Sequence, residues 1–201
     1  VRCRSGAYAG ATGERLWKHY LITEEPVQKS TGGVGNPMLG PSGASVWSAV
    51  TIDAKLRRIY VGTGDNYSNP TTATSDAIVA LSLDTGERLW VYQGLGGDAW
   101  NIGCGLESKY GCPEDSGPDQ DMGASPILIE RGDGRRVLIG AQKSGVVHAL
   151  DPDRDGALLW QRKVAEGGVQ GGLQWGQASD GRYLYASRSD LNWLDAGVYG
   201  P

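Results

Sequence analysis

The side chains best suited to chemistry lie in glycine-rich loops that follow short apolar segments. Asp65 comes directly after Gly62-Thr63-Gly64, and Lys143 stands directly before Ser144-Gly145. A carboxylate is a hard oxygen ligand that suits Ca²⁺, and a lysine cation stabilises an oxygen that gains negative charge. Both stretches are also ordinary turn sequences. The residue types therefore allow metal binding and electrostatic stabilisation, and they equally allow simple hairpin turns.

Composition and missing motifs exclude several classes of function. The net charge is −4, and no run of Lys or Arg exceeds two residues, so a nucleic-acid partner is not expected. No apolar stretch approaches the roughly 18 residues of a membrane helix. The motifs for covalent haem (Cys-x-x-Cys-His) and NAD (Gly-x-Gly-x-x-Gly opening a helix) are absent, and His19 and His148 are isolated. Because no signal-peptide pattern follows Val1, we expect the sequence to begin within a longer protein.

Two of the three cysteines stand close together in the sequence. Cys104 and Cys112 are eight positions apart in a loop rich in Gly and Pro, a spacing that could close a small disulfide ring. Two free thiols are the alternative. Cys3 is the odd cysteine in either case.

An internal repeat runs along the chain. The hexapeptide Thr-Gly-Glu-Arg-Leu-Trp at residues 12–17 recurs letter for letter at 85–90, and a diverged copy lies at 155–160. Apolar segments ending in Ala-Leu precede the last two copies. The repeating unit is therefore a strand, a tight Gly turn and a strand with Trp. This pattern predicts equivalent positions for Trp17, Trp90 and Trp160.

The complete repeat unit has four strands. Two more strand signals precede each of the later copies, at 46–52 and 58–62 and at 124–129 and 136–140. Four short strands joined by Gly and Asp turns are typical of a β-propeller blade, so the fold class is all-β. We predict complete blades at 44–93 and 123–164 and partial blades at 1–20 and 171–201. Because the Trp residues are 73 and 70 positions apart, long excursions at 22–43 and 94–122 are expected to carry function.

These features resemble a known family. The motif Ala-x-Asp-x-x-Thr-Gly-x-x-x-Trp is the blade-docking motif of the pyrroloquinoline quinone (PQQ) repeat propellers, and it is matched at 80–90 and, with a slip in the position of Asp, at 149–160. Residues 43–48, 62–68, 97–101 and 123–126 are similar to the polyvinyl alcohol-oxidising branch of the PQQ dehydrogenases. The resemblance covers nearly the whole chain. It implies a fragment of a PQQ-repeat propeller of the eight-bladed type.

The resemblance also implies a site for PQQ and Ca²⁺. It places Trp47 under the flat quinone as a rigid π surface, Lys143 beside the reactive quinone oxygen, and Trp175 in the wall of the same pocket. Asp65 stands where the family has an Asn that binds Ca²⁺. This departure leaves Asn66 as an alternative ligand after a slip of one residue. For Trp47 the alternative is packing between blades.

The resemblance leaves the catalytic base open. In the family an Asp follows Asp-x-Trp, but here Asn101 follows Asp98-Ala99-Trp100. Measured backward from Ala124-Ser125-Pro126, the run Asp119-Gln120-Asp121 places Asp119 at the base position and makes it a second Ca²⁺ ligand. Asp121, Asp98 and a merely solvated acidic loop are the alternatives.

The implied reaction is the oxidation of a secondary alcohol such as polyvinyl alcohol. An Asp removes the hydroxyl proton, hydride passes to the quinone, and electrons leave to a cytochrome c outside this chain. The family setting implies the periplasm. A non-catalytic scaffold built from the same repeats and a dehydrogenase for another alcohol or a sugar remain alternatives. Blade topology predicts that Trp47, Asp65, Asp119 and Lys143 meet at one face near the propeller axis, an arrangement that a scaffold does not need.

Overall fold

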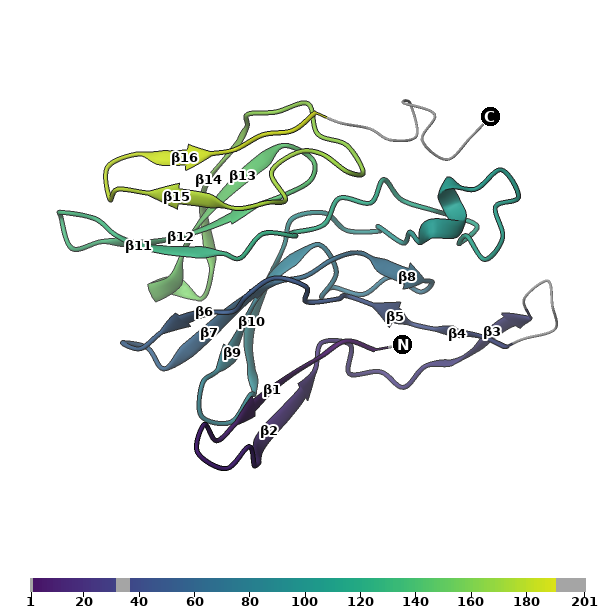
Figure 1. The fold of residues 1–201 in the computed structure, drawn as a ribbon, viewed down its shortest axis with the longest axis horizontal. Helices are drawn as coiled ribbons and strands as arrows, with labels where there is room; N and C mark the ends of the chain where they lie inside the picture. Colours follow the sequence, from purple (N-terminus) through teal and green to yellow (C-terminus); the bar gives the residue numbers. More distant parts are fainter. Residues whose placement is uncertain (1, 32–36, 191–201) are drawn as a thin grey trace.

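The computed structural model describes residues 2–31 and 37–190, and their regular structure is almost entirely antiparallel β-sheet. Two four-stranded sheets form the centre of the molecule (Figure 1). The first has the order β10-β9-β7-β6 and the second the order β11-β12-β13-β14. Their strands are β6 (Thr51–Asp53), β7 (Arg58–Gly62), β9 (Ala77–Ser82), β10 (Arg88–Gln93), β11 (Ile127–Glu130), β12 (Arg136–Ala141), β13 (Val146–Asp151) and β14 (Ala157–Lys163).

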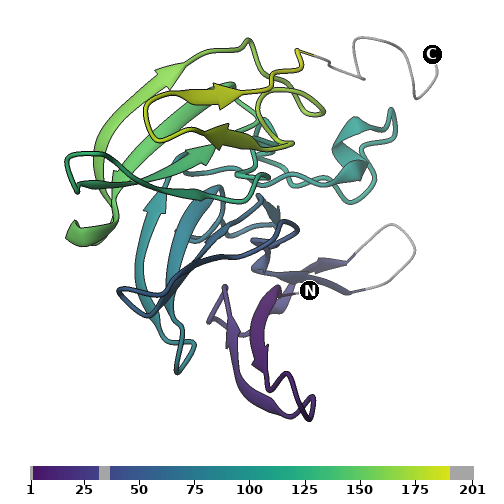
Figure 2. The ribbon, with the colours of Figure 1, turned by 60° about the vertical axis from the view of Figure 1, so that its left-hand side comes forward.

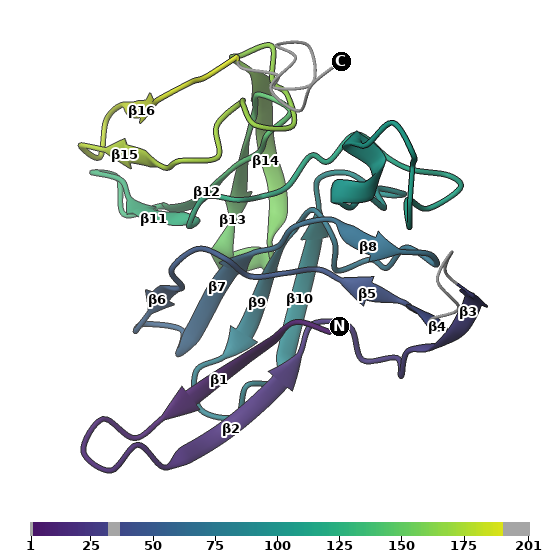
Figure 3. The same ribbon diagram turned by 45° about the vertical axis from the view of Figure 1, so that its right-hand side comes forward.

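A two-stranded sheet flanks each side of this pair. The β1 (Arg4–Tyr8) and β2 (Arg15–Tyr20) hairpin lies beside the first sheet, and β15 (Gln177–Ser179) with β16 (Leu184–Ala186) lies beside the second. Figures 2 and 3 show the four sheets following one another in chain order like the sections of a fan. A meandering antiparallel sheet of four strands is the unit of a β-propeller. Residues 191–201 of the last predicted partial blade lie outside the described residues.

The register of the hairpins confirms the equivalence of the three repeated tryptophans. Trp17 pairs with Ala7, Trp90 with Ala80 and Trp160 with Ala149, each beside an irregularity in the ladder. The first two rings pack on the Gly turn of the next sheet, because a Cβ at Gly86 or Gly156 would lie 2.4 or 2.6 Å from a ring carbon. The ring of Trp160 stays about half exposed.

Apolar side chains fill the spaces between successive sheets. The cluster between the two four-stranded sheets contains no exposed member, and burying each large side chain contributes about 1.5–3 kcal/mol. Its members are Tyr60, Ile78, Ala80, Trp90, Met122, Leu138 and Leu150. A second cluster joins β1–β2 to the first large sheet, and a third joins the second large sheet to β15–β16. This packing fixes the sheets relative to one another.

The innermost strands are shorter than predicted. The expected strand at 46–52 is regular only as β6, and the one at 124–129 only from Ile127 onward. Pro126 lacks the N–H that a ladder requires, and β11 begins only after it. The residues just before β6 and β11 therefore form loops.

The two excursions contain secondary structure of their own. The first holds the hairpin β3 (Val27–Thr31) and β4 (Pro37–Gly40), and β5 (Ser42–Gly43) pairs with β8 (Asn66–Ser68). The second holds the 3₁₀ helix η1 (Ile102–Gly105), and η2 (Pro152–Arg154) follows β13. In Figures 1 and 3 both excursions extend from the same side of the sheets.

The disulfide prediction is confirmed. Cys104 and Cys112 are bonded, with their Cα atoms 4.7 Å apart. The bridge closes the loop that begins at η1. Among the described residues, no helix is both long enough and apolar enough to cross a membrane.

Candidate cofactor and metal site

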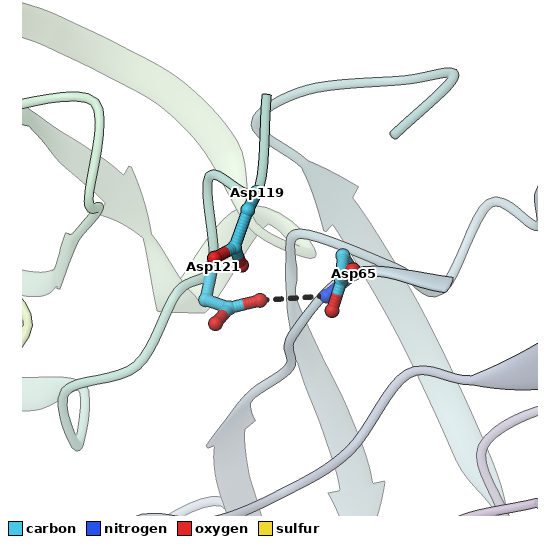
Figure 4. Close-up of side chains that lie close together, drawn as sticks. All are labelled: Asp65, Asp119 and Asp121. Atoms are coloured by element: carbon cyan, nitrogen blue, oxygen red, sulfur yellow. Dashed lines mark hydrogen bonds between the residues drawn. The ribbon is translucent and has the colours of Figure 1, made fainter. Parts of the chain in front are cut away.

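Strand ends bring the predicted site residues together. Asp65 follows β7, Lys143 follows β12, and Asp119 and Asp121 precede β11. Backbone hydrogen bonds hold these segments against one another, since Lys143 N donates to Asp121 O (3.0 Å) and Met122 N donates to Thr63 O (3.0 Å). Side chains more than 50 positions apart in the sequence therefore meet, as Figure 4 shows for the three aspartates.

Three buried carboxylates form the centre of the site. Oxygen atoms of Asp65, Asp119 and Asp121 all lie within 4.8 Å of one another. Asp121 Oδ1 accepts a hydrogen bond from Asp65 N (2.7 Å), the dashed line in Figure 4. This approach requires Gly64, because a Cβ there would lie 2.7 Å from Asp121 Oδ1.

Lys143 supplies the cation of the site. Its Nζ donates to Asp119 Oδ1 (2.9 Å) and lies 2.6 Å from Asp121 Oδ2. The lysine side chain is only 8% exposed, so solvent screens these ion pairs weakly. Burial lowers the pKa of Lys143, but Asp121 and Asp119 outweigh that effect and hold the pKa above its ordinary value.

The carboxylates carry more negative charge than Lys143 can balance. Burial, followed by Asp121 and Asp119, raises the pKa of Asp65 to about 10. Burial and Asp121 raise the pKa of Asp119 to about 7, although Lys143 acts in the opposite direction. A pKa near 7 suits a group that exchanges protons at neutral pH.

These residues fit a hard divalent cation. Asp65 Oδ2 is buried and has no hydrogen-bond partner, and two further carboxylates stand within the reach of one ion. Ca²⁺ binds such oxygen atoms at about 2.3–2.6 Å and removes the charge imbalance. Asp65 and Asp119 were predicted as ligands, and the cluster adds Asp121, which sequence reasoning had considered only as a base. The closeness of Asp119 and Asp121 in the sequence was the available signal.

Trp47 offers a flat surface beside the charged cluster. Lys143 Nζ lies 5.9 Å from the centre of the Trp47 ring, within the range of a cation–π contact. The ring packs on the backbone of Gly123, yet Trp47 remains 45% exposed. A flat, anionic ligand such as PQQ fits an exposed indole next to an ammonium group.

Trp175 lies farther out than the other predicted residues. Its turn touches the site through Gly172, which packs on the Lys143 backbone. The Trp175 side chain itself is 75% exposed. Its role in the pocket wall stays a prediction.

The alternative candidates have other partners. Asn66 is fully buried, and its amide binds Ser42 O (3.0 Å) and Thr72 N (2.7 Å) rather than facing the carboxylates. The Asp98 carboxylate accepts hydrogen bonds from Asp119 N (3.2 Å) and Gln120 N (2.8 Å). Asn101 caps η1 through Gly103 N (2.9 Å) and donates to Gly111 O (2.7 Å), which holds the disulfide loop.

A further buried carboxylate lies behind the site. Asp76 is fully buried, and neither of its oxygens makes a hydrogen bond of normal geometry. Burial, Asp98 and Asp121 raise its pKa to about 9, and a weak interaction with the Ser75 hydroxyl offsets only part of this. Nothing in the sequence around Asp76 separates it from an ordinary turn residue.

The fold and this site define a quinoprotein propeller. Residues 3–107 match the PQQ family described as the glucose/ethanol/alcohol dehydrogenase β-propeller domain, and the chain belongs to this family. The predicted resemblance is thereby confirmed. The chain is 41% identical, over 94% of its length, to a polyvinylalcohol dehydrogenase of a Pseudomonas species and 39% identical, over 92%, to that of Sphingopyxis sp. strain 113P3. It spans only 29% of the length of each of these relatives.

Solved structures agree on the fold. The quinohemoprotein alcohol dehydrogenase of Comamonas testosteroni superposes with a TM-score of 0.55 at 24% identity, covering 81% of this chain and 25% of that enzyme. A europium-containing methanol dehydrogenase gives a TM-score of 0.58 at 23% identity, covering 82% of this chain and 30% of that one. At this identity the likeness concerns the fold alone.

Proposed function

We propose that this chain is the catalytic part of a PQQ-dependent dehydrogenase that oxidises secondary alcohols, with polyvinyl alcohol as the substrate. One observation carries the proposal: Asp65, Asp119 and Asp121 form one buried cluster with Lys143 at its side. A purely structural propeller gains nothing from concentrating unbalanced buried charge, which destabilises a fold. Such a cluster is typical of a functional site.

Asp119 is the general base. Its carboxylate takes the hydroxyl proton of the alcohol, as a positioned Asp can do when it lies within hydrogen-bond reach of the substrate. A positioned base of this kind contributes about 10²–10⁴ in rate. Lys143 holds Asp119 through the 2.9 Å ion pair and provides positive charge next to the reacting oxygen atoms.

Asp65, Asp119 and Asp121 would hold Ca²⁺, and Trp47 with Lys143 would hold PQQ, with Trp175 at the outer wall. When bound, Ca²⁺ polarises the quinone and PQQ accepts the hydride. The chain's own residues orient these groups and exclude water from the carboxylates, which are at most 5% exposed.

The substrate assignment rests on the relatives. The two polyvinylalcohol dehydrogenases are 41% and 39% identical to this chain, whereas the quinohemoprotein alcohol dehydrogenase of Comamonas testosteroni is 29% identical over 75% of the chain. This difference favours the polymer over simple alcohols and sugars. It places the chain nearer to the polymer-oxidising enzymes than to the other quinoproteins named here.

The remaining calls concern the setting of the site. We propose an eight-bladed propeller with blade boundaries at 44–93 and 123–164 and partial blades at 1–20 and 171–201. Electrons would leave to a cytochrome c outside this chain, and the enzyme would work in the periplasm. The two four-stranded sheets support the boundaries of the complete blades, and the family membership of residues 3–107 supports the other points.

The test is reconstitution of the intact protein with PQQ and Ca²⁺. Dye-linked oxidation of polyvinyl alcohol, a small secondary alcohol and glucose would be compared under identical conditions. We expect the polymer to be oxidised with the highest kcat/KM. A protein that binds neither PQQ nor Ca²⁺ and oxidises none of the three would be a scaffold, and preference for glucose would replace the substrate assignment.

A further inference from the structure

We infer that Asp98 is a positioning residue that holds Asp119 in place across the disulfide loop. The inference rests on the proposed function, because it treats Asp119 as the base and as a metal ligand. Both carboxylate oxygens of Asp98 accept hydrogen bonds from backbone N–H groups. Asp98 acts through the backbone of the segment that carries Asp119.

Asp119 needs such support because its backbone is unfavourable on its own. It has φ 58°, in the left-handed region that L-residues other than Gly rarely occupy. The segment before it is a long loop that includes the disulfide ring of Cys104 and Cys112. Without an external tether, neither feature directs the Asp119 carboxylate toward Asp65.

Asp98 supplies that tether with both of its oxygen atoms. Oδ1 accepts from Asp119 N (3.2 Å) and Oδ2 accepts from Gln120 N (2.8 Å), and Asp98 is fully buried. Hydrogen bonds from backbone N–H groups to a carboxylate are stronger than those between neutral groups. Gly117 also packs directly on Asp98, since a Cβ there would lie 2.3 Å from Oδ1.

Asp98 is itself fixed to the other half of the site. Its carbonyl oxygen accepts from Asn66 N (3.1 Å), and Trp100 N donates to Asn66 O (2.7 Å). Asn66 is the direct neighbour of Asp65. A continuous chain of contacts thus runs from Asp65 through Asn66 and Asp98 to Asp119.

This chain of contacts sets the separation between the Asp65 and Asp119 carboxylates. Gly117 N donates to Ala99 O (3.0 Å), so the two ends of the disulfide loop are pinned beside Asp98. The loop between them can then vary without moving Asp119. Asp98 therefore fixes the position of Asp119 even though a long loop separates the two residues in the sequence.

The test measures Ca²⁺ binding and amide exchange in the intact protein carrying Asp98→Ala. Groups that orient metal ligands typically contribute 10–100-fold to metal affinity, so we expect calorimetry with Ca²⁺ alone to show about that loss. Hydrogen exchange at the Asp119 and Gln120 amides should accelerate about tenfold or more. Asp98→Asn keeps one acceptor oxygen, so its Ca²⁺ affinity and amide exchange rates should lie between those of the unsubstituted protein and those of Asp98→Ala.

Two further variants separate positioning from charge and from misfolding. Asp53→Asn changes an equally buried carboxylate whose partners are Arg136 and Tyr60 rather than the Asp119 segment, and it should leave the Ca²⁺ affinity within about threefold, well below the 10–100-fold expected of an orienting group. Gly117→Ala keeps Asp98 but displaces its carboxylate, so it should cause the same loss of Ca²⁺ affinity and the same faster exchange. It takes the place of Asp98→Ala as the test if Asp98→Ala does not fold.

The outcomes distinguish this inference from the proposed function. Equal losses of affinity in Asp53→Asn and Asp98→Ala, or loosened amides with unchanged affinity in Asp98→Ala, would overturn the positioning role. If the unsubstituted protein binds no Ca²⁺ while the two amides still loosen in Asp98→Ala, the positioning role stands and the proposed metal site falls.

Discussion

Strands β7 and β12 carry buried charges at both of their ends, and the two ends are built in opposite ways. After the strands lie Asp65 and Lys143 of the candidate site, and at their starts lies a network centred on Arg136. Arg136 Nη1 donates to Asp53 Oδ2 (2.8 Å) across the two sheets, and Asp153 binds the same guanidinium. The Tyr60 hydroxyl donates to Asp53 Oδ2 as well (2.9 Å).

The pKa values show the difference between the two ends. Burial acts to raise the pKa of Asp53, but hydrogen bonds from Leu56 N, Tyr60 and Arg136 outweigh it and hold the pKa below its usual value. For Asp65, burial and the neighbouring carboxylates act in the same direction, and the pKa rises to about 10. Both side chains are almost inaccessible, at 1% and 4% exposure.

Burial alone therefore does not decide the state of a carboxylate. The Asp53 end is balanced by its own partners and joins one sheet to the next. At the Asp65 end three carboxylates face one lysine, so their ionised forms are balanced only when a proton or a cation from outside binds. The first arrangement serves stability and the second serves binding.

The largest expected effect is on activity at the Asp65 end. Asp119→Asn in the protein loaded with PQQ and Ca²⁺ should lower kcat by about 10²–10⁴, because an amide cannot accept the alcohol proton. Dye-linked turnover measures it. Asp133→Asn, in an exposed turn, is the matched control and should turn over normally. If Asp119→Asn keeps more than about a tenth of the normal kcat, Asp119 is not the base, because loss of a general base lowers the rate by about 10²–10⁴.

Isosteric substitutions at the two ends should affect the free energy of unfolding differently. Asp53→Asn leaves the Arg136 guanidinium short of its buried partner and should lower the free energy of unfolding by about 3 kcal/mol. Asp65→Asn replaces a carboxyl that a pKa of about 10 keeps protonated at neutral pH, so it creates no unpaired buried charge and should leave the metal-free protein equally stable or more stable. Urea unfolding in a chelating buffer compares them. A similar loss in both variants would contradict the comparison.

The pH dependence should follow the same division. Asp65 titrates at about 10 in the folded protein against a usual 3.8, so the metal-free folded state binds more protons than the unfolded state between these values. The free energy of unfolding should therefore fall as pH rises from about 5 to about 9, and the Asp119 part should be lost through about 7.

Saturating Ca²⁺ supplies the control for this pH series. The ion balances the ionised carboxylates, so the decline with pH should shrink or disappear. Asp53 acts with the opposite sign, since its lowered pKa stabilises the fold above 3.8 and this contribution is lost on acidification. A metal-free protein that gains stability steadily from about pH 5 to 9 would refute the charge imbalance at Asp65.

The smallest expected effect is the loss of one hydroxyl at the balanced end. Tyr60→Phe removes a single hydrogen bond to Asp53, while Arg136 and Leu56 N remain, and should lower the free energy of unfolding by about 1.5 kcal/mol. Ca²⁺ affinity should not change, because Tyr60 lies away from the carboxylate cluster. Tyr183→Phe, at a residue 54% exposed, is the control. Weakened Ca²⁺ binding in Tyr60→Phe would show that the two ends are coupled.

Much of the fold could be predicted from local patterns. The repeated hexapeptide placed Trp17 and Trp90 correctly because the Gly turn and the Trp strand form one hairpin, whose contacts are mostly local. The pairing of Cys104 with Cys112 was open to prediction for the same reason. The inner strands were overestimated because the strand-like pattern continues through residues 46–50 and 124–126, which form no ladder in the fold.

The sequence by itself determined the all-β class and the family, and it predicted Trp47, Asp65, Asp119 and Lys143 as the residues of one candidate site. Only the tertiary structure decided that Asp121 joins Asp65 and Asp119, that Asp98 turns to the backbone of the Asp119 segment, and that Asn66 serves as a buried link. Strand patterns and turns follow from neighbouring residues, whereas the meeting of the carboxylates depends on how the two four-stranded sheets are placed relative to each other. That placement depends on the apolar packing between the sheets and on contacts such as the hydrogen bond from Asp65 N to Asp121 Oδ1, whose partners are 56 positions apart.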